Sequence, residues 1–310
     1  MKKLVLFLAL ALSTISLTAC GATPVAGDGL AVVATTTQVT EFTQAVVGDT
    51  GTVTGLIQPN QSAHSFDPSA KQLLELSQAA AVVMNGAELE PWLEDALTAA
   101  NFQGVLIDAS QGIPLIEKDP HVWTAPLNAE QMVTTISAGL ATVPGVDAQQ
   151  KAELTVNAEN YNLQLAALDE WILANLEQVP SEERLLVTNH DAFTYFVDAY
   201  DITFLGSIIP SFDDNAEPSA AELDQLIELI QSSGATAIFS EASISPKLAE
   251  TIAAEAGVKV YSGDDALYSD SLGVAGSNGE TYITATIHNV TMLMASWGYP
   301  VLPLPTELQS

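Results

Sequence analysis

Residues 147–178, DAQQKAELTVNAENYNLQLAALDEWILANLEQ, carry the longest helical pattern of the chain and contain neither proline nor glycine. Apolar side chains recur at helical spacing along this segment, namely Leu154, Tyr161, Leu165, Leu168 and Ile172. The pattern predicts a single helix that ends before Pro180 and, with about 30 residues, is roughly 45 Å long. Because this is longer than one small lobe is wide, we expect the helix to join two lobes.

The segments on either side of the long helix alternate between strand-like and helix-like patterns. The apolar runs expected to be strands include LAVVATTT, TVTGLIQ, AAVVMNG (80–86), GVLIDAS (104–110), RLLVTNH (184–190), ITFLGSII, ATAIFSE and VKVYSG. The segments expected to be helices include residues 68–79, 89–101, 192–201, 218–234 (opened by Pro218) and 282–298. Strands that alternate with helices favour α/β lobes with mainly parallel sheets.

The expected fold class is therefore α/β, with two lobes that each contain a mainly parallel sheet flanked by helices. One long rigid helix joins them. We place the N-terminal lobe at residues 30–146, the linking helix at 147–178 and the C-terminal lobe at 179–310.

The N-terminus has the pattern of a secretory signal. Lys2 and Lys3 precede an apolar run at residues 4–17, which is shorter than the roughly 20 residues that a membrane span needs. The following LTAC resembles a bacterial lipobox, so we expect a signal peptide at 1–19, lipidation of Cys20 and a tether at 20–29. The mature protein would then be extracytoplasmic and anchored to the cell membrane. The alternative is a stray cysteine near an ordinary signal-peptidase site.

The chain is strongly acidic, with 8 basic against 38 acidic residues and a formal net charge of −30. Nucleic acid is therefore excluded as a partner, because phosphate binding requires a basic patch. A cationic ligand is compatible with this charge, which would raise the local cation concentration. The charge is also compatible with a solubilising surface, because the acidic residues are scattered along the sequence.

Three of the four histidines lie in connections from a strand to a helix. His64 follows TVTGLIQ, His121 precedes the helix that begins after Pro126, and His190 ends RLLVTNH. In open parallel sheets, ligands bind at the carboxyl ends of the strands. Each histidine alone is typical of a surface or capping residue, but three imidazoles at equivalent positions suit a zinc site. His288 lies inside the last expected helix and is interpreted as structural.

A closed tetrahedral zinc site requires a fourth ligand. Asp270 follows the last expected strand and is flanked by small polar residues. Asp264 and Asp265 are nearby alternatives. Glu241, at the end of ATAIFSE, is a further alternative ligand or a residue that supports the ligands from behind.

Five segments resemble motifs of a known family in the same order. These are AHSFDPSA (63–70), AAVVMNGAELEPWLEDAL (80–97), DPHVW (119–123), NHDAFTYFVDAY (189–200) and LYSDSLG (267–273). Together with the long helix and the lipobox, they resemble the TroA-like solute-binding lipoproteins of zinc and manganese ABC transporters. The resemblance extends from about residue 30 to residue 300.

The resemblance implies a metal ion held between the lobes by His64, His121, His190 and Asp270. The first two would come from the N-terminal lobe and the last two from the C-terminal lobe. The rigid helix would limit opening to a small tilt. The partners implied are a membrane permease and its cytoplasmic ATPase, and a monomer is expected.

The sequence also departs from the family pattern. Ala63 replaces the usual proline before the first histidine, and Phe66 and Asp67 replace tyrosine and glutamate. Residues 111–120 lack the histidine-rich loop of many zinc members.

The third ligand position favours zinc. Manganese members usually have glutamate there, whereas this chain has His190, and nitrogen-rich ligand sets suit Zn²⁺. We therefore predict zinc, with manganese or iron as alternatives. Neutral imidazoles are required, so affinity should fall below about pH 6.5.

Two other functional classes stay open at this point. A zinc hydrolase would leave a coordination position for water and use Glu241 as a base, but the chain has no HExxH motif. A metal-independent adhesin or structural lipoprotein is the second. No enzymatic activity is expected.

Overall fold

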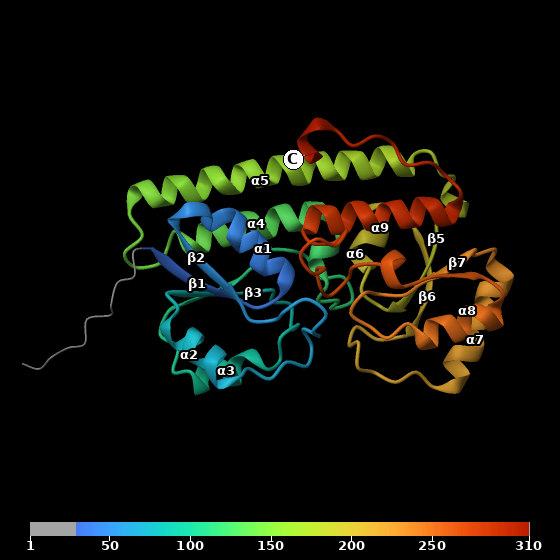
Figure 1. The fold of residues 1–310 in the computed structure, drawn as a ribbon, viewed down its shortest axis with the longest axis horizontal. Helices are drawn as coiled ribbons and strands as arrows, with labels where there is room; N and C mark the ends of the chain where they lie inside the picture. The colour runs from blue at the N-terminus through green and yellow to red at the C-terminus, as the bar shows by residue number, and fades with distance from the viewer. Residues whose placement is uncertain (1–28, 310) are drawn as a thin grey trace, which may run out of the picture.

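The computed structural model describes residues 29–309, which form two α/β lobes joined by one long helix (Figure 1). The signal peptide expected at residues 1–19, Cys20 and the tether before Gly29 lie outside the described residues. Within residues 29–309, no helix combines the length and hydrophobicity that crossing a bilayer requires.

The N-terminal lobe is built on a parallel sheet with strand order β2-β1-β3-β4. Helices α1 and α4 pack between this sheet and the long helix, whereas α2 and α3 contact each other across the opposite side (Figure 1). The elements are, in chain order, β1 (Leu30–Ala34), α1 (Thr37–Val47), β2 (Gly51–Gly55), α2 (Ala70–Gln78), β3 (Ala81–Met84), α3 (Leu93–Ala99), β4 (Val105–Asp108) and α4 (Pro126–Leu140).

The C-terminal lobe contains two parallel strand pairs, β5-β6 and β7-β8, and β7 lies beside β5. Helices α7 and α8 pack together on one side, and α9 contacts the long helix on the other. The elements are β5 (Leu185–His190), α6 (Thr194–Ala199), β6 (Thr203–Ile209), α7 (Ala220–Ser233), β7 (Ala237–Phe239), α8 (Lys247–Ala256), β8 (Lys259–Tyr261) and α9 (Tyr282–Trp297).

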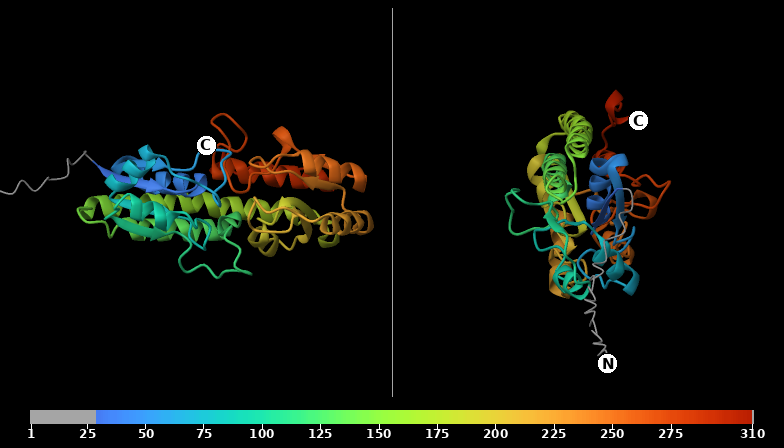
Figure 2. Two further views of the ribbon diagram at one scale, coloured as in Figure 1. Left: turned by 90° about the horizontal axis from the view of Figure 1, so that it is seen from below. Right: turned by 90° about the vertical axis from the view of Figure 1, so that its left-hand side faces the viewer.

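The long helix is α5 (Ala148–Leu176), which confirms the expectation for residues 147–178 within two residues at each end. Asp147 caps its N-terminus in a capping box with Gln150. The helix runs along both lobes (Figure 2), packing on α1 and α4 of the first and on α9 of the second. Its buried apolar residues belong to one continuous core with residues of both lobes, so the lobes share an apolar core along the helix.

The expected alternation of strands and helices is confirmed, and the differences lie at the ends of elements. Expected strands such as LAVVATTT and ATAIFSE are shorter in the structure, as β1 and β7. Helices α3 and α6 are shorter than the expected 89–101 and 192–201. Residues Ala87 and Glu88 have positive φ, so the chain turns after β3, and residues 89–92 connect this turn to α3 without forming helix. Helix α7 begins at Ala220 rather than at Pro218, because Ser219 caps it in a capping box.

Candidate metal centre

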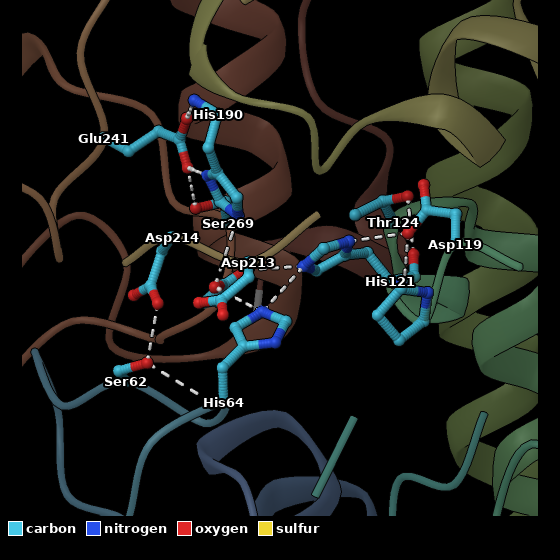
Figure 3. Close-up of polar contacts among 12 residues, drawn as sticks. Ser62, His64, Asp119, His121, Thr124, His190, Asp213, Asp214, Glu241 and Ser269 are labelled. Atoms are coloured by element: carbon cyan, nitrogen blue, oxygen red, sulfur yellow. Dashed lines mark hydrogen bonds and ion pairs between the residues drawn. The ribbon is translucent and has the colours of Figure 1, made fainter. Parts of the chain in front are cut away.

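Four side chains from different loops meet between the two lobes. His64, His121, His190 and Asp270 each offer one atom, and these atoms all lie within 4.8 Å of one another. His64 lies between β2 and α2, His121 precedes the turn before α4, His190 is the last residue of β5, and Asp270 follows β8. The structure therefore brings together the four residues that the sequence singled out, and Figure 3 shows the three imidazoles pointing toward one another.

The Asp270 carboxylate lies at the centre of the group. Its Oδ2 is 3.4 Å from Nε2 of His64 and 3.3 Å from Nε2 of His190, and its Oδ1 is 3.2 Å from Nε2 of His121. The two Nε2 atoms of His64 and His121 are 3.3 Å apart. All three imidazoles thus present the same ring nitrogen to one small volume.

Asp119 determines the orientation of His121. Its Oδ1 lies 2.6 Å from Nδ1 of His121 and accepts a hydrogen bond from the His121 backbone N–H at 2.8 Å. The Tyr195 hydroxyl donates to the Asp119 carbonyl at 2.7 Å. A carboxylate on Nδ1 directs Nε2 toward a metal and raises its basicity. Sequence analysis missed Asp119, and its only signal was its place in DPHVW, two residues before the histidine.

Glu241 has the corresponding position behind His190. Its Oε2 lies 2.6 Å from Nδ1 of His190, and its Oε1 accepts a hydrogen bond from the His190 backbone N–H at 2.9 Å. The Ser269 hydroxyl also donates to Oε2 of Glu241 (Figure 3). The structure therefore places Glu241 outside the group of four, where it orients His190.

The other candidates lie away from this group. Asp264 and Asp265 are exposed in the 3₁₀ turn Gly263–Asp265. His288 is buried in α9 with Nε2 3.0 Å from the Ala266 carbonyl oxygen, in agreement with a structural histidine. Burial is the largest cause that lowers the pKa of His288.

Burial and neighbouring charges shift the pKa values of the group in opposite directions. Burial lowers the pKa of His121, but the carboxylates of Asp270 and Asp119 raise it by more, to about 9. Burial also lowers the pKa of His190, but the charges of Glu241 and Asp270 hold this pKa well above its usual range. Burial would raise the pKa of Asp270, yet the charges of His190 and His121 keep it well below the ordinary value.

His64 is the one partly exposed member of the group, and the other three are buried. Beside it, loops of the two lobes touch. The Ser62 hydroxyl donates to Asp214 at 2.9 Å (Figure 3). The Asn215 amide donates to the Ser65 hydroxyl at 3.2 Å. Burial is the main cause that raises the pKa of Asp214. Solvent reaches the group on the His64 side, between these loops.

The chain is similar to curated proteins over most of its length. It is 30% identical over 305 residues to the manganese-binding lipoprotein MntA of Bacillus subtilis, covering 93% of this chain and 97% of that protein. It is 32% identical over 280 residues to the zinc-binding lipoprotein AdcA of Streptococcus pneumoniae, covering 84% of this chain and 54% of AdcA. This chain thus spans about half of AdcA, and the two relatives are named for different metals.

The fold matches a solved structure. The periplasmic zinc-binding protein TroA of Treponema pallidum superposes with a TM-score of 0.79 at 26% sequence identity, covering 87% of this chain and 99% of TroA. This likeness confirms the α/β fold expected from the sequence.

The match to a family model extends over residues 32–296 and confirms the resemblance drawn from the five motifs. The matched family and the relatives are metal-binding components of transporters and not enzymes. The chain belongs to the family described as zinc-uptake complex component A periplasmic, ZnuA.

Proposed function

We propose that this protein captures Zn²⁺ outside the cytoplasm with His64, His121, His190 and Asp270 and delivers it to a membrane permease. Family membership makes the chain a metal-binding, substrate-binding component of an ABC transporter. The proposal adds the identity of the ion, the four ligands and the release of the ion to a permease driven by a cytoplasmic ATPase.

The single observation that carries the zinc assignment is the donor set of the group, three imidazole nitrogens and one carboxylate. Nitrogen-rich sets suit Zn²⁺, whereas oxygen-rich sets suit Mn²⁺. The spacing is compatible with one shared ion, because the four ligand atoms all lie within 4.8 Å of one another.

The hydrogen bonding of Asp270 also supports a cation as ligand. Both carboxylate oxygens are buried and lie 3.2–3.4 Å from the three Nε2 atoms, without hydrogen-bond geometry to any of the described residues. A buried carboxylate requires a neighbouring positive charge, which either protonated imidazoles or a bound cation can supply. In the metal-loaded protein, a divalent cation between Asp270 and the three Nε2 atoms supplies it.

Manganese is the alternative ion, because relatives such as MntA are named for it. The experiment that separates the two is metal analysis of protein purified without chelators, followed by competition between Zn²⁺ and Mn²⁺ in calorimetry. Co-purified zinc and a strong preference for Zn²⁺ are expected. Co-purified manganese or a preference for Mn²⁺ would contradict the assignment.

We also propose that the mature protein is a monomer anchored to the membrane through lipidated Cys20. Several relatives are named lipoproteins, and LTAC has the pattern of a lipobox. The lobes are proposed to divide at residues 147 and 178, next to the ends of α5. Metabolic labelling with a radioactive fatty acid is expected to mark the unmodified protein and not a Cys20→Ser variant, and equal labelling of the two would contradict the anchor.

A further inference from the structure

The loop that carries Asp270 is bound by side chains of the other lobe. Gln38, in the first turn of α1, donates from Nε2 to the Ser269 carbonyl oxygen at 2.7 Å. The indole Nε1 of Trp123 donates to the same oxygen at 3.2 Å. Gln38, Trp123 and Ser269 are all buried. Two N-lobe donors therefore converge on the carbonyl that immediately precedes Asp270.

The Gln38 amide is itself oriented. The Thr37 hydroxyl donates to Oε1 of Gln38 at 3.0 Å, so Oε1 acts as acceptor and Nε2 is left as the donor toward Ser269. Thr37 has a second contact with the same loop, because its Oγ1 accepts a hydrogen bond from the Leu272 backbone N–H at 2.8 Å. The start of α1 thus binds the loop on both sides of Asp270.

The preceding part of the loop is bound to the C-terminal lobe. The Tyr268 backbone N–H donates to Asn289 of α9 at 2.8 Å, and the Ser269 hydroxyl donates to Glu241. Ser269 contacts both lobes, because its hydroxyl contacts Glu241 of the C-terminal lobe and its carbonyl accepts from Gln38 and Trp123 of the N-terminal lobe. Asp270 therefore directly follows the residue at which the loop is bound to both lobes.

We propose that Gln38, assisted by Trp123, is a positioning residue that holds Asp270 in the orientation for metal binding. This inference rests on the proposed ligand role of Asp270. The peptide bond between Ser269 and Asp270 is planar, so fixing its carbonyl oxygen also fixes the Asp270 N–H and Cα. The Gln38 amide donates to the Ser269 carbonyl and not to the Asp270 carboxylate, so it acts on Asp270 through this peptide.

Loss of the Gln38 donor leaves a buried carbonyl with one weaker partner and lets the peptide tilt. The Ser269 hydroxyl still contacts Glu241, so the orientation of His190 is retained and the effect falls on Asp270. Because these hydrogen bonds join the two lobes, their loss is expected mainly to speed metal release, as most changes in affinity act on dissociation.

The test measures Zn²⁺ affinity and dissociation rate for Gln38→Met, which keeps the size of the side chain and removes the donor. Zinc binding is expected to weaken roughly three- to tenfold, the range for one net hydrogen bond, through faster dissociation. Trp123→Phe, the second variant, is expected to act in the same direction. Gln178→Met is the matched control, because Gln178 also donates to backbone carbonyls but lies at the end of α5, and it should bind zinc as the unmodified protein does.

A double-mutant cycle with Asp270→Asn separates positioning from a general structural role. In the Asp270→Asn background, Gln38→Met should change zinc affinity by less than about twofold, because the residue it positions is already altered. An equal effect in both backgrounds, or unchanged zinc binding in both Gln38→Met and Trp123→Phe, would overturn the inference. If Asp270→Asn alone leaves affinity unchanged, the proposed ligand set fails instead, so the two failures are distinguishable.

Discussion

His64 and His121 come from loops 57 positions apart in the sequence, and their Nε2 atoms lie 3.3 Å apart between the lobes. Two imidazoles at this separation repel each other when both are protonated. They accommodate each other when both are neutral and share a cation.

Removal of one ligand tests the donor set. His64→Ala is expected to weaken zinc binding by more than about a hundredfold. Loss of a residue that only hydrogen-bonds to a metal ligand costs up to about a hundredfold, and loss of the ligand itself should cost more. Calorimetry with a competing chelator measures this loss. His288→Gln is the matched control, because His288 contacts the Ala266 carbonyl and lies outside the group. Equal affinities of the two variants would contradict the assignment of His64.

Asp119→Asn tests the orientation of His121. The amide cannot supply the negative charge that makes the imidazole more basic, so zinc affinity should fall by about ten- to a hundredfold. Asp264→Asn, at an exposed turn, removes the same charge and should leave affinity unchanged. A parallel fall in both variants would indicate an effect of overall charge instead of an effect on His121.

His190→Glu tests the basis of metal choice. The substitution gives two imidazoles and two carboxylates, an oxygen-rich set that suits manganese. We expect the ratio of zinc to manganese affinity to fall at least about tenfold, measured by competition titration. Unchanged relative affinities would show that the third position does not determine the metal.

The pH dependence of stability should differ between the metal-free and zinc-loaded protein. Asp270 and Asp119 raise the pKa of His121 to about 9 in the metal-free protein despite its burial. Since this folded-state pKa lies above the unfolded value of about 6.5, the stabilisation is complete below pH 6.5 and is lost as pH rises through about 9. The melting temperature of metal-free protein should therefore fall from pH 6.5 to 9.

Zinc displaces the His121 proton, so the loaded protein should lack this fall, and zinc affinity should keep rising up to about pH 9. With an ordinary histidine pKa of about 6.5, the rise in zinc affinity would instead end near pH 6.5. Calorimetric melting of both forms across this range measures the difference. Parallel pH profiles of the two forms would contradict proton displacement at His121.

Much of the architecture and the three histidines could be predicted from the residues themselves, because their signals are local. Asp270 stands out from Asp264, Asp265 and Glu241 only through the family resemblance. The apolar spacing of residues 147–178 is typical of a helix, and histidines after strands lie at the ligand-binding edge of a parallel sheet. Gln38 could not be found in this way, because it contacts Ser269 across 231 positions and leaves no local pattern. Glu241 is a candidate from the sequence because it ends an expected strand, but its contact with the His190 backbone, 51 positions away, has no local signal.

The most direct measurement of the central claim is a crystal structure of the zinc-loaded protein with anomalous diffraction collected at the zinc absorption edge. We predict one strong anomalous peak between the lobes, bonded to Nε2 of His64, His121 and His190 and to the Asp270 carboxylate. A peak elsewhere, or a shell in which water replaces any of these four ligands, would contradict the account.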